Sequence, residues 1–191
     1  MKLLKITTAI LALTAPLAIA QTSTWKADSA HSEVDFSIKH LAISNVRGHF
    51  GKVEVTINYD EKDVSKSSVQ ATIDVNGIDT GEAARDNDLK TESFFDVEKF
   101  PTATFASTSV AKTSTGLKVN GNLTLHGVTK PVVLNIDGPT APVSGMDKKP
   151  HVGFSATTTI NRSDFGIGSK VPVAIVGDEV KLTIDLDASK Q

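Results

Sequence analysis

The segment HSEVDFSIKH, residues 31–40, alternates between residues that suit a protein interior and residues that suit water. One face of this segment would carry Ser32, Val34, Phe36, Ile38 and His40. The other face would carry Glu33, Asp35, Ser37 and Lys39. Alternation with a period of two is typical of a β-strand that buries one of its faces. We therefore predict a half-buried strand here.

The same alternation recurs along most of the chain. Further strands are expected at 25–28, 52–59, 69–76, 102–112, 117–125, 131–137, 152–160 and 180–187. Their inward positions include Val55, Ile73, Leu123 and Phe154, which together with Ile38 are candidate ligand contacts. Residues 138–150, rich in Pro, Gly and Lys, predict a long surface loop. About eight one-faced antiparallel strands must close on a shared interior, which predicts an all-β sandwich or up-and-down barrel.

The expected interior consists mainly of Val, Ile, Leu, Ala and Gly, and aromatic residues make up only 5% of the chain. An eight-stranded barrel lined by such side chains can leave a channel for one apolar ligand. The same side chains could instead fill the barrel. The alternation alone leaves both possibilities open.

The segment DTGEAARDNDLKTESFFDVEKFPTATF, residues 79–105, interrupts the strands with the one convincing helix signal after the N-terminal region. Asp79 followed by Glu82 predicts a capping box and a helix over 81–90. A second short turn at 91–95 would present Phe94 and Phe95. A barrel does not need this insertion, near residues 80–96, in order to close. We therefore expect it to cap one end or to form the entrance.

The first 20 residues resemble a secretory signal peptide. Lys2 and Lys5 precede an apolar run over 6–15, and Ala18-Ile19-Ala20 is typical of a cleavage site. The run is too short to span a bilayer as an anchor. We predict cleavage after Ala20, one exported domain over 21–191, and no stable membrane insertion.

Charge and cysteine content exclude several classes of function. The net charge of −2 becomes −4 when Lys2 and Lys5 are removed, so it gives no reason to expect nucleic acid or an anionic membrane as partner. The absence of cysteine excludes disulfides, a thiol nucleophile and cysteine metal sites.

The five histidines form no metal-binding motif, so we expect no metal, and the sequence calls for no cofactor. His40 is either a structural histidine or a hydrogen-bond donor to a ligand head group. Arg47, Arg85 and Arg162 could bind a phosphate, pyrophosphate or quinone oxygen at the mouth of a pore. Alternatively, Arg85 or Arg162 pairs with Asp86 or Asp164 and holds the insertion to the barrel.

No nucleophile elbow or paired carboxylates indicate catalysis, and we predict no catalytic residue. Several phenylalanines could serve either as core residues or as ligand contacts. They are Phe36, Phe50, Phe94, Phe95, Phe105, Phe154 and Phe165.

Four blocks of the chain, in order, resemble the YceI-like family of polyisoprenoid-binding proteins. They are HSEVDFSIKHLAISNVRGHFG from His31, RDNDLKTESFFDVEKFPTATF from Arg85, GNLTLHGVTKPV from Gly121 and NRSDFGI from Asn161. The resemblance implies a lipocalin-like, extended eight-stranded antiparallel barrel whose pore holds a long isoprenoid chain, in an exported, periplasmic protein. The family often has a histidine where this chain has Asn87 or Asp88, so no role for a histidine carries over.

Together these features predict a non-enzymatic carrier for a polyisoprenoid or similar amphiphile, such as a polyprenyl phosphate or quinone. An alternative is an envelope enzyme or redox accessory that uses a quinone-like ligand, which would require a polar pair such as His40 with Arg47 or Asp86. A third is a structural protein with a filled core. The sequence leaves a homodimer possible.

Overall fold

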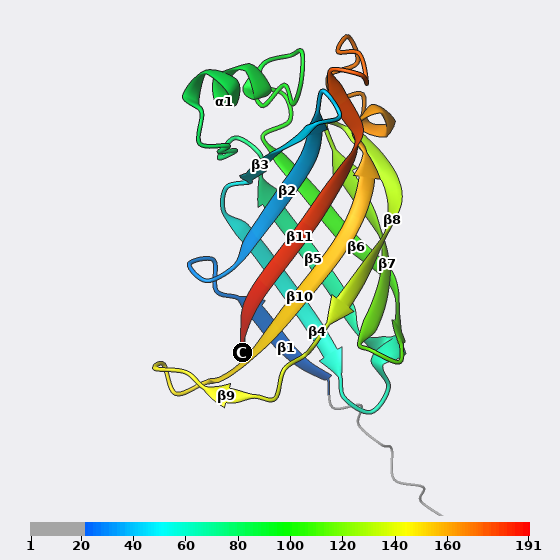
Figure 1. The fold of residues 1–191 in the computed structure, drawn as a ribbon. Helices are drawn as coiled ribbons and strands as arrows, with labels where there is room; N and C mark the ends of the chain where they lie inside the picture. The colour runs from blue at the N-terminus through cyan, green and yellow to red at the C-terminus, as the bar shows by residue number, and fades with distance from the viewer. Residues whose placement is uncertain (1–21) are drawn as a thin grey trace, which may run out of the picture.

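The chain folds into one antiparallel barrel with a single helix at one end (Figure 1). The computed structural model describes residues 22–191, so the predicted signal peptide and its cleavage site lie outside the described residues. The all-β fold with one short helical insertion is confirmed.

The elements follow the predicted alternation closely. The strands are β1 (Thr22–Ala27), β2 (Glu33–His40), β3 (Ser44–His49), β4 (Val53–Asp60), β5 (Ser68–Asp74), β6 (Thr102–Lys112), β7 (Leu117–Leu125), β8 (Val128–Asp137), β9 (Val143–Ser144), β10 (Pro150–Asn161) and β11 (Val176–Lys190). The helical elements are η1 (Val64–Lys66), α1 (Ala83–Lys90) and η2 (Arg162–Phe165).

Eight strands close the barrel in the order β11-β1-β4-β5-β6-β7-β8-β10, and β10 pairs back to β11. Strand β11 is long enough to take two partners along one edge. Its 188–190 segment pairs with β1, and its 176–185 segment pairs with β2. Strand β3 then pairs with β2, so this hairpin continues the wall toward the α1 end (Figure 1).

As it is between β1 and β11, the wall is paired over only three residues between β8 and β10. These strands pair only over 135–137 with 155–157, whereas β10 pairs with β11 from His151 to Asn161. Within the described chain, the rest of β8 toward Val128 is therefore paired on its β7 side alone. Pro131 lies in this part and has no N–H to donate, which a strand with an unpaired edge tolerates.

Two local predictions were wrong. Strand β3 was not expected, because Ser44, Asn45 and Gly48 have low β-propensity; pairing with β2 determines its conformation instead. The strand predicted over 131–137 begins earlier, at Val128, because the tight turn is His126-Gly127, both at positive φ (51° and 73°). Two residues at positive φ match the twist of a tight β-hairpin.

The predicted inward residues do line the interior. Val53, Val75 and Val119 are each 1% exposed, and two clusters of buried apolar side chains occupy the two halves of the barrel. Because every wall strand contributes only one face, burial of these side chains supplies most of the driving force for closure.

The His126-Gly127 turn provides a test of the hairpin. A Cβ on Gly127 would lie 2.6 Å from Phe100 Cε1, whereas a Cβ on Gly81, at the similar φ of 74°, would meet nothing within 4 Å. We expect Gly127→Ala to lower the free energy of unfolding by about 3 kcal/mol and Gly81→Ala by about 1 kcal/mol. Urea denaturation measures both, and equal losses would contradict the packing of Phe100 on this turn.

Candidate functional site

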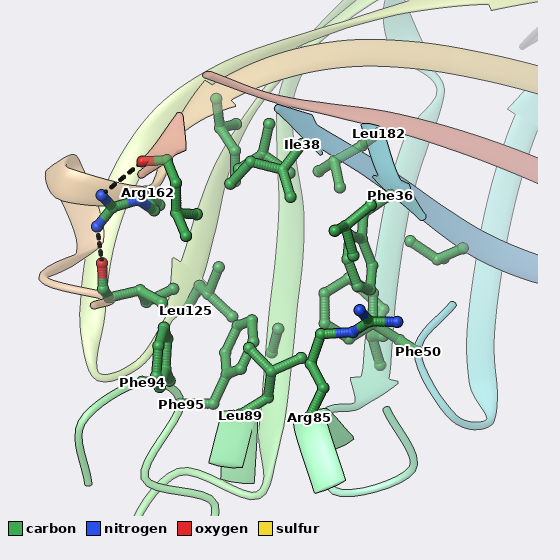
Figure 2. Close-up of a pocket in the computed structure, with 18 of the residues that line it drawn as sticks. Phe36, Ile38, Phe50, Arg85, Leu89, Phe94, Phe95, Leu125, Arg162 and Leu182 are labelled. Carbon is green, nitrogen blue, oxygen red and sulfur yellow. Dashed lines mark hydrogen bonds between the residues drawn. The ribbon is translucent and has the colours of Figure 1, made fainter. Parts of the chain in front are cut away.

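The barrel contains an apolar cavity that opens beneath α1 (Figure 2). Its volume is about 350 Å³. Its walls include Phe36, Ile38, Phe50, Ile73 and Leu123, all predicted as ligand contacts. Phe36, Phe50 and Phe95 form a chain of aromatic contacts there, with ring centroids 5.4 and 5.9 Å apart. Such a surface suits a hydrocarbon chain, because burial of apolar area is itself favourable.

A second, smaller cavity of about 110 Å³ lies deeper in the barrel. Val55 and Phe154, also predicted as ligand contacts, line it. The two cavities share Val34, Ile73, Leu123 and Leu182 in their walls. They are therefore successive parts of one apolar interior, divided at a layer of aliphatic side chains.

Apart from Arg162, the polar side chains that line the upper cavity gather at its mouth. Lys39 and His40 come from the end of β2, and Arg85 and Asp88 come from α1. Figure 2 shows Arg85 and Leu89 rising from the helix, with Phe94 and Phe95 beside them. The insertion thus lies over one end of the barrel, as predicted.

None of the residues of α1 is buried. Hydrogen bonds to the segment that precedes the helix hold its first turn in place. Glu82, and not Asp79, is its N-cap, and the Asp79 carboxylate instead accepts from the Gly81 N–H at 2.7 Å. The predicted cap was wrong because the chain turns at Gly81, with φ of 74°, before the helix begins.

Arg85 and Asp86 do not pair with each other but both bind Thr80. Arg85 donates from Nε to Thr80 Oγ1 at 2.7 Å and from Nη2 to the Thr80 carbonyl at 3.0 Å. Asp86 Oδ1 accepts from the Thr80 N–H at 2.9 Å and from its hydroxyl at 2.6 Å. These bonds fix the first turn of α1 to the preceding loop.

Arg162 lines the cavity but is a structural residue of the loop between β10 and β11. Its guanidinium donates five hydrogen bonds to the carbonyls of Ile167, Gly168, Val171, Val176 and Gly177, at 2.7–3.0 Å. These use all five N–H groups of the side chain, which is 5% exposed. Pairing with Asp164 was therefore wrong, and no donor is left for a head group.

Two other predicted contacts lie away from both cavities. Arg47 lies in an exposed groove on the outer face, with Ser37 and Thr183, because it occupies an outward position of β3. Phe165, the last residue of η2, is 1% exposed and packs in the core. The structure lines the cavity instead with residues that the prediction omitted, including Leu89, Leu125, Ile160, Val176 and Leu182. The alternation already placed Ile160 and Leu182 inward, whereas no sequence signal identified Leu89.

The role of Arg162 can be tested by stability. Arg162→Met leaves five carbonyls without this donor, and we expect a loss of more than about 3 kcal/mol in unfolding free energy. Arg162→Lys retains three donors and should lose less. Arg47→Met, on the outer face, is the control and should change stability by less than about 0.5 kcal/mol. Similar midpoints in urea for Arg162→Met and the control would refute the structural role.

A polar cluster lies at the other end of the barrel. His151 bonds Asp187 through Nδ1 at 2.7 Å and Asp147 through Nε2 at 3.1 Å, while His31 bonds Asp28 at 2.9 Å. The bonds to Asp187 and then Asp147 raise the pKa of His151, and the bond to Asp28 raises the pKa of His31. No group of three metal-binding side chains occurs in the part of the chain that the structure describes.

These contacts predict a pH dependence of stability. Because the pKa of His151 is raised in the folded state, its bonds to the carboxylates stabilise the fold fully below the unfolded-state pKa of about 6.5. This stabilisation is lost as pH rises through the folded-state pKa. The Lys149 N–H and His151 lower the pKa of Asp147, whose contribution disappears as pH falls below about 3.8. We therefore expect stability to fall from pH about 6 to about 8. Urea denaturation of His151→Gln should show a flatter slope there than wild type, and an unchanged slope would contradict the assignment.

Known proteins match nearly the full length of this chain. The family model described as YceI-like domain matches residues 25–188. Protein YceI of Salmonella newport is 38% identical over 193 residues, which cover 99% of this chain and 97% of that protein.

Solved structures agree with the fold. BcnA of Burkholderia cenocepacia has 27% identity and a TM-score of 0.72, over 84% of this chain and 98% of that chain. The YceI protein of Campylobacter jejuni has 32% identity and a TM-score of 0.71, over 80% of this chain and 90% of that chain. A polyisoprenoid binding domain from Saccharophagus degradans has 16% identity and a TM-score of 0.65, over 90% of this chain and 100% of that chain. At this identity the likeness is one of fold alone.

Proposed function

The chain belongs to the YceI-like domain family, and we propose that it is an exported carrier for a long-chain polyisoprenoid or similar amphiphilic lipid. The observation that carries this proposal is the apolar interior, in which the charged lining groups lie at the mouth apart from Arg162, whose N–H groups are all bonded to carbonyls. An amphiphile fits this distribution in one orientation, with its chain inward and its head group under α1. The polyisoprenoid-binding neighbour supports the same ligand class.

The head group, such as the phosphate of a polyprenyl phosphate or the oxygens of a quinone, would lie between β2 and α1. Arg85 donates two of its five N–H groups to Thr80, so its guanidinium is oriented at the mouth with donors to spare. His40 and Lys39, at the end of β2, also line the upper cavity. In this proposal Arg47 and Arg162 take no part, for the reasons of position and hydrogen bonding given above.

Periplasmic localisation belongs to the same proposal and rests on the signal-peptide pattern before Gln21. Across residues 22–191, no helix has the length and apolar character needed to cross a membrane. We propose a binding role without catalysis. The alternative as an enzyme or redox accessory required His40 to face Arg47 or Asp86, but Arg47 lies outside and the Asp86 carboxylate binds Thr80.

Native mass spectrometry of protein purified from its own host tests the proposal. We expect a bound lipid that denaturation releases, and uptake of added polyprenyl phosphate by protein stripped of it. Absence of co-purified lipid together with failure to take up added polyprenyl ligands would refute the proposal.

The layer between the two cavities predicts a dependence on chain length. Leu182→Trp should fill the junction, so that long prenyl chains bind at least about tenfold more weakly while chains confined to the upper cavity bind nearly as before. Thr183→Trp, at the adjacent outward position, is the matched control. Titration with prenols of graded length measures both variants, and an equal loss for all lengths would contradict a chain that passes this layer.

A further inference from the structure

Two loops beside the mouth expose large apolar side chains to solvent. Leu41 and Ile43, in the turn between β2 and β3, are 45% and 82% exposed, and Val173 and Ile175, in the loop before β11, are 60% and 43% exposed. The Leu41 N–H donates to the Ile175 carbonyl at 2.8 Å, so the two loops are joined. We call these four residues the apolar rim. Figure 1 shows both loops at the α1 end of the barrel.

The apolar rim is continuous with the lining of the cavity. His40 and Val46, on either side of the β2–β3 turn, line the upper cavity, and so does Val176, which directly follows Ile175. An apolar chain leaving the cavity beside these residues would thus pass from buried side chains to exposed ones. Exposed apolar side chains gathered in this way mark an interaction site more often than scattered ones do.

The two segments that carry the rim have charge of one sign, whereas α1, at the same end, also carries Asp86 and Asp88. Residues 39–50 and 165–177 contain no aspartate or glutamate, and they carry Lys39, Arg47 and Lys170, all exposed. The chain as a whole is acidic, with a net charge of −2. Net charge gave no reason to expect an anionic membrane, but the distribution of charge provides one, because attraction to a surface depends on the groups that face it.

We propose that the apolar rim docks the barrel on the surface of a bilayer that contains anionic phospholipid, with the cavity mouth facing the membrane. The four side chains would enter the interfacial region, and Lys39, Arg47 and Lys170 would contact the head groups. A lipid chain could then pass between bilayer and cavity without exposure to water. The proposal deepens the carrier function and rests on it. A second copy is a poorer occupant, because a two-fold contact would bring the same cations of both copies together.

Vesicle binding tests this docking. The probes are vesicles of phosphatidylcholine alone and of phosphatidylcholine mixed with phosphatidylglycerol, at low and high salt. We expect the full chain to co-sediment with the anionic vesicles, and high salt or Lys170→Glu to weaken binding. The double variant Ile43→Ser, Val173→Ser should bind at least about tenfold more weakly. Met146→Ser is the matched control, because Met146 is fully exposed in the loop after β9, at the opposite end (Figure 1).

A second measurement separates docking from lipid binding. A prenol delivered from cyclodextrin should enter the double variant as readily as it enters wild type. Transfer of the prenol from vesicles should be slower to the double variant than to wild type. Failure of the wild-type chain to bind anionic vesicles, or equal binding by the double variant, overturns the docking. If wild type does not bind vesicles but forms concentration-dependent dimers, and the double variant does not dimerise, the rim binds a second copy and the membrane docking is overturned. Vesicle binding without prenol uptake by any variant instead overturns the carrier function.

Discussion

Strand β11 holds the barrel closed. One edge pairs with β10 from His151 to Asn161, and the other pairs first with β2 and then with β1. Because two short strands share one edge of a long one, the β2–β3 hairpin extends the wall past the end of β4 (Figure 1). Phe36 and the exposed Leu41 and Ile43 lie on that extension, and His49 at the end of β3 pairs with Asp79, which precedes α1. The mouth therefore exists because β11 is longer than its partners.

Buried polar groups are satisfied in ways that leave the cavity apolar. Arg162 enters the cavity wall, yet its charge faces five carbonyls of its own loop, and no buried side-chain nitrogen or oxygen among the described residues lacks a partner. Arg85 and Asp86 likewise satisfy each other indirectly through Thr80. Charges needed for loop geometry are thus neutralised locally, and only the mouth has donors suited to a head group.

The period of two predicted one-faced strands around an apolar interior, because burial on one face is a local property of each strand, whereas the choice of a barrel over a sandwich came from the family resemblance. The sequence predicted less where a partner decides the conformation. Strand β3 forms because β2 pairs with it, and Arg47 points outward because that register places it opposite Ser37. Leu89 enters the cavity through the placement of α1, which depends on contacts of Thr80 and Phe94 rather than on helix periodicity.

The short pairing between β8 and β10 has a consequence for how the interior accommodates its contents. The ladders β10–β11, β6–β7 and β7–β8 are long, so widening the wall at these pairs would break many backbone hydrogen bonds. Between β8 and β10 the backbone pairing is confined to one end, and the other end is bridged by His126 Nδ1 and the Phe165 carbonyl oxygen, 2.9 Å apart. Separation of the strands there would break this one bond rather than a ladder. A branched or bulky chain would therefore be accommodated by outward movement on this side. The depth of the interior is fixed, whereas its width can change between β8 and β10.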